Sequence, residues 1–158
     1  MLSKVTARII ALGLLASVAS FSASAYAGEC PADQVMAGAL TSGETMPTGV
    51  TDEVLSAIDL TPKGDAWKGN MLRLRKLVVQ PGGVVPWHEH SARPANIVII
   101  EGSITEYRSD CKVPIEHTAG DAIPEFGDVA HWWKNNGGVP TVLYSADILA
   151  PEMDGHTM

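Results

Sequence analysis

The segment from Gly82 to Gly102 reads GGVVPWHEHSARPANIVIIEG, and it indicates the fold more directly than any other part of the chain. His88 and His90 lie two positions apart, so both imidazoles point to the same face if this segment is a strand. Pro86-Trp87 precedes the pair and an apolar run, residues 97–100, follows it. This setting favours two metal ligands over two surface histidines on an edge strand.

Short apolar segments separated by turn residues continue on both sides of this segment. In residues 70–80, Leu72 and Leu74 alternate with Arg73 and Arg75, and Pro81-Gly82-Gly83 is expected to end that strand. Many short strands with Gly and Pro turns predict an all-β antiparallel barrel or sandwich. The other expected strands are residues 54–60, 85–90, 96–101, 103–107, 115–118, 121–123, 130–134 and 142–149.

The first 27 residues have the features of a secretory signal peptide. Lys4 and Arg8 form a positive n-region, residues 9–21 are apolar, and Ala25-Tyr26-Ala27 predicts cleavage before Gly28. The apolar run is too short for a membrane span, and no second run of spanning length follows it. We therefore expect a periplasmic or secreted protein made of a signal peptide (1–27), an N-terminal arm (28–50), a barrel (51–150) and a polar tail (151–158).

Charge and cysteine content agree with export. The net charge is -7, and removal of Lys4 and Arg8 with the signal peptide gives -7 - 2 = -9. So acidic a chain repels phosphate backbones, which argues against nucleic acid as a partner. In an oxidising compartment we expect Cys30 and Cys111 to form a disulfide, with two unpaired thiols as the alternative. The disulfide would join the arm to the barrel and stabilise the fold by about 4 kcal/mol.

A third imidazole has to come from elsewhere in the chain. His131 is the best candidate because it lies in another expected strand, Ala130-His131-Trp132-Trp133. Neutral imidazoles suit Fe, Ni, Cu and Zn. His117 and His156 lack such a setting, and we expect both to be solvated.

Two spaced motifs resemble those of the cupin family. The first consists of Gly82, His88-Glu89-His90 and Gly102, and the second of Gly120, His131 and Asn135. The resemblance covers residues 70–149 and implies a jelly-roll β-barrel, often dimeric, with a metal near one mouth. Small exported cupins are similar to this chain.

One departure from the family pattern concerns the metal site. The cupin pattern has a ligand Glu where this chain has Ala95. Three readings are open: a three-histidine site like that of thiol and diketone dioxygenases, another carboxylate such as Glu101 reaching the ion, or an organic ligand bound without metal. We favour a bound divalent transition metal, Fe, Mn, Ni, Cu or Zn, at His88, His90 and His131.

The expected function is binding or oxidation of a small molecule. Tyr107, Trp133 and Arg93 are expected to line the substrate pocket. Arg73, Arg75 and Arg93 could bind an anionic substrate near the mouth, although solvated strand faces are expected for at least two of them. A dioxygenase-type oxidation is the first hypothesis and a non-catalytic binding protein the second. Open metal positions facing a cavity with further polar groups would favour the enzyme.

Overall fold

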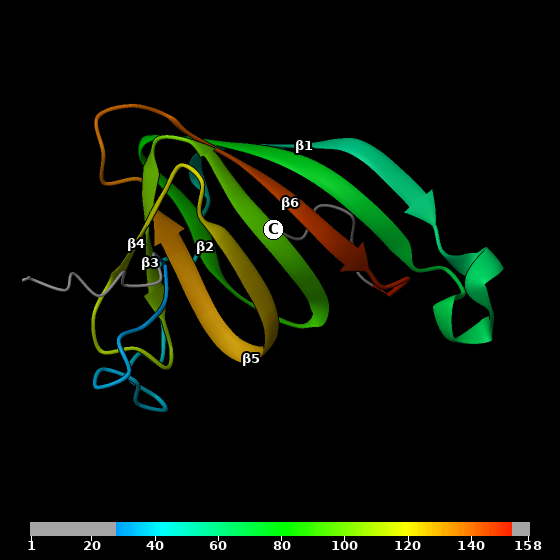
Figure 1. The fold of residues 1–158 in the computed structure, drawn as a ribbon, viewed down its shortest axis with the longest axis horizontal. Helices are drawn as coiled ribbons and strands as arrows, with labels where there is room; N and C mark the ends of the chain where they lie inside the picture. The colour runs from blue at the N-terminus through cyan, green and yellow to red at the C-terminus, as the bar shows by residue number, and fades with distance from the viewer. Residues whose placement is uncertain (1–27, 153–158) are drawn as a thin grey trace, which may run out of the picture.

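The computed structural model describes residues 28–152. The expected signal peptide (1–27) and His156 lie outside these residues, as does most of the expected tail. The elements are β1 (Thr48–Asp59), two 3-10 turns η1 (Thr61–Lys63) and η2 (Asp65–Trp67), β2 (Met71–Glu101), β3 (Ser103–Arg108), β4 (Ile115–Thr118), β5 (Ala122–Lys134) and β6 (Thr141–Leu149) (Figure 1). Within the described residues, none of the helical segments is long and apolar enough to span a membrane.

All strand pairings are antiparallel, which confirms the all-β prediction. The long strand β2 curls around β6 and pairs with it twice: Leu72 lies opposite Ile148, and Asn96 lies opposite Ala146. This double pairing closes the sheet into a barrel (Figure 1). The expected break at Pro81-Gly82-Gly83 is wrong, because Gly82 adopts φ +77° and bends the strand without ending it. Three expected strands are therefore one element.

The barrel core is aliphatic and surrounds one tryptophan. Alternate residues of β2 and β6 are buried, as the period of a strand with one face inside requires. The core residues are Leu77, Val79, Val85, Ile97, Ile99, Ile104, Ile123, Trp133 and Leu143.

The three arginines expected near the mouth or on solvated faces are all inside the barrel. Arg73, Arg75 and Arg93 are 4%, 5% and 2% exposed. Each contacts the carboxylate of Asp147, at 2.7 Å, 3.2 Å and 3.4 Å respectively, and Arg75 also pairs with Asp52. The expectation of solvated faces was wrong because strand alternation shows which side chains share a face but not which face is enclosed. The contacts with the Asp147 carboxylate offset the desolvation cost of burying the three guanidinium groups.

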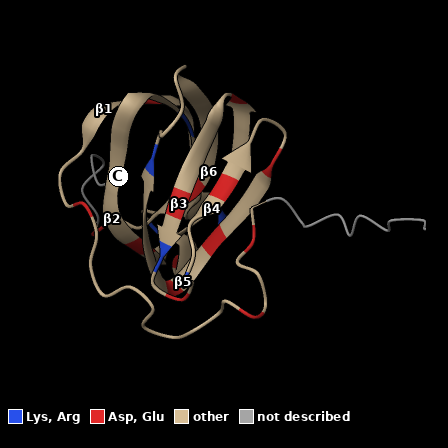
Figure 2. Cartoon of the chain, turned by 90° about the vertical axis from the view of Figure 1, so that its left-hand side faces the viewer, with Lys and Arg blue, Asp and Glu red and all other residues tan. Residues whose placement is uncertain are grey.

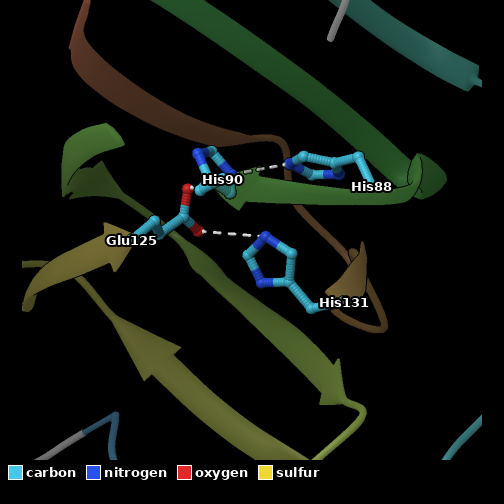
Figure 3. A group of neighbouring side chains, drawn as sticks. All are labelled: His88, His90, Glu125 and His131. Carbon is cyan, nitrogen blue, oxygen red and sulfur yellow. Dashed lines mark hydrogen bonds and ion pairs between the residues drawn. The ribbon is translucent and has the colours of Figure 1, made fainter. Parts of the chain in front are cut away.

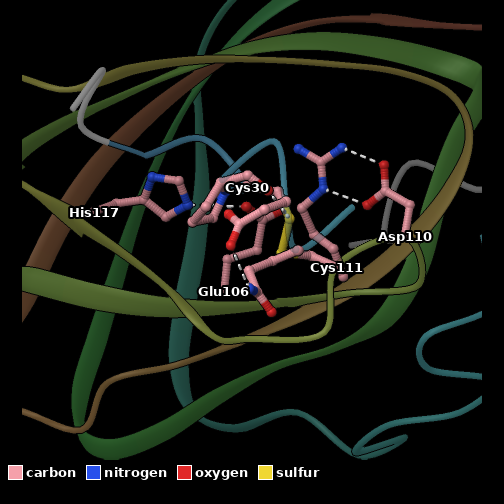
Figure 4. The surroundings of a disulfide bond; sticks show 9 residues. Cys30, Glu106, Asp110, Cys111 and His117 are labelled. Atoms are coloured by element: carbon pink, nitrogen blue, oxygen red, sulfur yellow. Dashed lines mark hydrogen bonds and ion pairs between the residues drawn. A yellow bond between two sulfur atoms is a disulfide. The ribbon is translucent and has the colours of Figure 1, made fainter. Parts of the chain in front are cut away.

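The segment before β1 lies across one end of the barrel. A disulfide joins Cys30 to Cys111 in the loop between β3 and β4 (Figure 4). Val35 forms an antiparallel bridge with Cys111, and Trp87 N–H donates to Glu44 O at 2.6 Å. The disulfide fits an oxidising compartment. It also fixes the N-terminal segment beside the histidines described next.

Candidate metal centre

Three histidines from two neighbouring strands converge at the barrel mouth. His88 and His90 share one face of β2, and the register of β2 with β5 sets His88 opposite His131. The ring centroids are 4.6 Å to 5.2 Å apart. Figure 3 shows the three rings pointing toward one another.

The Nδ1 atom of each ring is held by an oxygen that can only accept a hydrogen bond. His88 Nδ1 lies 2.7 Å from Pro86 O, His90 Nδ1 lies 2.8 Å from Arg93 O, and His131 Nδ1 lies 2.5 Å from Glu106 Oε1. Nδ1 of His88 and Nδ1 of His90 therefore carry the proton, and their Nε2 atoms keep lone pairs directed at the common centre. This is the tautomer that a metal-binding histidine needs. Nδ1 of His131 contacts both the Glu106 carboxylate and the indole N–H of Trp133, which lies 3.1 Å away.

A carboxylate that sequence reasoning missed completes the group. Glu125 of β5 lies opposite Ala95 of β2. Its Oε2 is 2.9 Å from His90 Nε2 and its Oε1 is 3.6 Å from His131 Nε2 (Figure 3). Glu101, the carboxylate considered from the sequence, is exposed and outside this group. A signal for Glu125 was its place six residues before His131, an even spacing that puts both on one face if β5 is continuous.

The four side chains could hold a metal ion. Their ligand atoms all lie within 4.8 Å of one another. His131 Nε2 and both oxygens of Glu125 are buried and accept or donate no hydrogen bond among the described residues. His88 Nε2 and His90 Nε2 face each other at 2.9 Å with their lone pairs. Both nitrogens could therefore bind one ion at the usual distance of about 2.1 Å.

Burial keeps His88 neutral. Removal from water is the main cause that lowers its pKa, to about 2, and the neighbouring rings of His131 and His90 lower it further. For His131, burial also lowers the pKa, but the hydrogen bond with Glu106 and the charge of Glu125 outweigh it and raise the pKa above its usual value. A cation at Nε2 would replace the proton that these carboxylates favour.

Glu106 connects the metal centre to a second buried histidine. Burial would raise the pKa of Glu106, but the hydrogen bonds with His117 and His131 prevail and lower it to about 2. His117 Nε2 lies 2.9 Å from Glu106 Oε2, and its ring stacks on Trp133 with centroids 4.9 Å apart. His117 is 0% exposed, so the expectation of a solvated histidine was wrong. The contact with the buried carboxylate of Glu106 makes the burial of His117 favourable, and the sequence around His117 does not show this contact.

Two cavities border the four side chains. The larger, about 410 Å³, opens at the mouth and is lined by His90, His131, Glu125 and Glu106, together with Arg108 and residues of the disulfide-bonded segment. Acidic positions lie on β3, β4 and β5 in this part of the barrel (Figure 2). The smaller, about 20 Å³, lies inside and has room for about one water molecule.

The structure separates the three expected pocket residues. Arg93 and Trp133 line the small inner cavity next to His88 and His90. Tyr107 lines neither cavity, because it lies on the other face of β3 and stacks on Trp132 with centroids 4.2 Å apart. Glu106, its neighbour in sequence, points inward instead, as strand alternation requires.

The barrel and its His/Glu cluster define the molecule as a cupin-type protein with a candidate metal centre. Residues 75–147 match the Cupin_2 family, described as a cupin domain. This match confirms, over residues 75–147, the resemblance noted in the sequence. No curated protein matches the chain significantly.

Solved structures with the same fold are distant in sequence. A predicted oxalate decarboxylase from Thermotoga maritima is 15% identical, with a TM-score of 0.52 over 77% of this chain and 99% of that one. The Cupin_2 domain of an XRE family transcriptional regulator from Enterobacter cloacae is 14% identical, with a TM-score of 0.47 over 66% of this chain and 100% of that one. These likenesses concern the fold alone.

Proposed function

We propose that this chain is an exported, metal-dependent cupin that acts on a small molecule at its barrel mouth. His88, His90 and His131 would bind a divalent transition metal through Nε2, and Glu125 would supply a carboxylate oxygen. The observation that carries the proposal is the convergence of three imidazole nitrogens and a buried carboxylate without hydrogen bonds of its own among the described residues. Imidazole nitrogens with one carboxylate oxygen would suit Fe, Mn, Ni, Cu or Zn.

The mouth cavity supports catalysis over simple metal storage. An ion held by His88, His90, His131 and Glu125 would have room for a substrate on the side of the mouth, and a bound Fe or Mn would supply the redox chemistry of a dioxygenase-type oxidation. The chain supplies a cavity of about 410 Å³, which suits a small molecule. Arg108, half-buried and paired with Asp110 at 2.9 Å, offers a guanidinium to a polar group of that molecule.

The second candidate is a protein that binds a metal or small ligand without catalysis. The small inner cavity favours it, because about 20 Å³ beside the ligands excludes a substrate from that side. The two functions differ in whether the ion exchanges its remaining ligands through the mouth.

Metal analysis of the exported protein, purified without a chelator or a histidine tag, tests the proposal. We expect near-stoichiometric metal in the wild type and loss of it in the His88→Ala/His131→Ala variant, with Glu53→Gln on the exposed strand β1 as a control outside the site. Oxygen uptake with panels of small acids, thiols and diketones then tests the dioxygenase reaction. A wild type that binds none of Fe, Mn, Ni, Cu or Zn after reloading would refute the metal site.

We also propose that the chain forms a homodimer. Ile58 of β1 pairs with Leu72 of β2, and together with Leu74 they form an apolar patch on the outside of the barrel, 57%, 38% and 40% exposed. Leu74→Glu should shift the sedimentation coefficient to that of a monomer. Val139→Glu, an equally apolar and exposed site in the loop before β6, should leave it unchanged.

A further inference from the structure

The buried His117 has one ring nitrogen that lacks a donor. Its Nε2 carries the proton, because Glu106 Oε2 at 2.9 Å is an ionised carboxylate oxygen and can only accept. Nδ1 therefore bears a lone pair, yet it is buried and forms no hydrogen bond within residues 28–152. Buried acceptors are almost always satisfied, so a donor is expected here.

Gly28 packs directly against this nitrogen. A Cβ on Gly28 would lie 2.4 Å from His117 Nδ1 and 2.8 Å from Cε1, so no side chain fits at this position. The φ of +90° also requires glycine. The nitrogen of Gly28, bonded to the same Cα, is about 2.5 Å from that Cβ position and therefore within about 5 Å of Nδ1.

We propose that cleavage of the signal peptide before Gly28 creates an α-amino group that donates a hydrogen bond to Nδ1 of His117. This bond would complete a chain from Gly28 through His117 and Glu106 to His131. Cleavage of the signal peptide would thus complete the hydrogen bonds that position His131, a proposed metal ligand. The inference rests on the export and metal site proposed above.

Cleavage changes what the nitrogen of Gly28 can do. In the uncleaved chain it is a peptide nitrogen with one N–H, whose direction is set by the peptide plane. Once it is terminal, it can rotate about the Cα–C bond into the position that a Cβ would take. A shift of a few tenths of an ångström then gives an ordinary hydrogen bond of about 2.8 Å to Nδ1.

The charges around Gly28 favour an ammonium. Gly28 lines the mouth cavity, and so do Glu29, Glu106, Asp110 and Glu125, whereas Arg108 is the one cation in that lining. Carboxylates therefore outnumber Lys and Arg in this lining, and a positive N-terminus among them is stabilised. The amine acts as a positioning group, because it reaches His131 only through His117 and Glu106.

Exporting the full chain with and without a serine inserted between Ala27 and Gly28 tests the inference. Intact mass first establishes whether the mature chain begins at Gly28 or carries the extra serine. Three readouts follow: the rate of N-terminal labelling by an amine reagent at neutral pH, the ¹⁵N shifts of the His117 ring, and Mn²⁺ affinity by chelator competition. His117→Gln in both backgrounds is the control, because Nδ1 is absent there.

We expect the chain that begins at Gly28 to label at least about tenfold more slowly and to bind Mn²⁺ up to about tenfold more tightly than the extended chain, with Nδ1 shifted as a hydrogen-bond acceptor. In His117→Gln both differences should vanish. If His117→Gln does not fold, the labelling rates and the ¹⁵N shifts of the two chains that keep His117, with and without the inserted serine, test the inference. A chain that begins elsewhere, or equal labelling in both, overturns the inference. A protected amine in a protein that binds no metal supports the N-terminal contact and instead refutes the proposed metal site.

Discussion

Ala95 of β2 and Glu125 of β5 lie directly opposite each other, so the carboxylate missing from one strand is replaced from its neighbour. Ala95 is 6% exposed and Glu125 also 6% exposed, and the alanine leaves room for the longer side chain across the pair. Cross-strand partners on one face have Cβ atoms about 4.5–5.5 Å apart, which a carboxylate can span. The candidate carboxylate ligand therefore comes from β5 and not from β2.

Moving the carboxylate back across the sheet should restore the site. Glu125→Ala is expected to weaken metal binding at least about tenfold, because a charged ligand is lost. Ala95→Glu in the Glu125→Ala background should recover most of that affinity. Calorimetric titration with Mn²⁺ measures both. Unchanged affinity in Glu125→Ala would mean that Glu125 does not act as a ligand, and a double variant no better than the single one would mean that a carboxylate at position 95 does not reach the ion.

Glu106 should support the metal without touching it. Glu106→Gln removes the charge that holds Nδ1–H of His131, and we expect metal affinity to fall about 10- to 100-fold. Glu53→Gln on the exposed strand β1 is the matched control and should bind as the wild type does. Equal affinity in all three proteins would rule out this role.

The disulfide should contribute much of the stability. The Cys30→Ser/Cys111→Ser variant lacks the crosslink between two residues 81 positions apart. We expect it to lose about 4 kcal/mol of unfolding free energy, because its unfolded chain is no longer constrained. Urea denaturation measures the loss. Reduced wild type should match the variant, and a large difference between them would point to the serines rather than to the crosslink.

Asp147 should matter more than Asp52 for folding. Asp147→Asn leaves Arg73, Arg75 and Arg93 without their shared carboxylate in the barrel and should cost about 3–5 kcal/mol. Asp52 has a side chain that is 17% exposed and forms its ion pair with Arg75, which also contacts Asp147, so Asp52→Asn should cost about 1 kcal/mol. Urea midpoints in the reverse order would contradict the central place of Asp147.

The metal-free protein should lose stability as the pH falls below about 6.5. Burial lowers the pKa of folded His88 from 6.5 to about 2, so in this range the unfolded chain binds a proton that the folded chain does not. The loss from this group is up to about 1.4 kcal/mol per pH unit.

His131 changes the stability of the metal-free protein above pH 6.5 and not below it. Its folded pKa is raised, so its contribution is complete below 6.5 and is lost as the pH rises through the folded value. Denaturation of chelator-treated protein between about pH 5 and pH 8 checks both directions. His88→Asn should flatten the acidic limb, and an unchanged slope there would show that His88 is not the group that titrates.

The sequence by itself determined the class of fold and the position of the histidines along it. Strand alternation is local, with a period of two residues, so His88 and His90 had to share a face. The spacing of His131 in a second motif pointed to a third nitrogen. These features depend on neighbours in the chain and can be found without a structure.

Only the tertiary structure decided which face is enclosed and which strands meet in register. Arg73 and Arg75 alternate with leucines as surface residues would, yet the closed barrel and Asp147 make theirs the inner face. His117 is buried by its contact with Glu106, and Glu125 becomes a candidate ligand because β5 pairs with β2 at Ala95. Alternation specifies neither the register nor the partner strand, and a shift of one residue would turn each of these side chains to the opposite face.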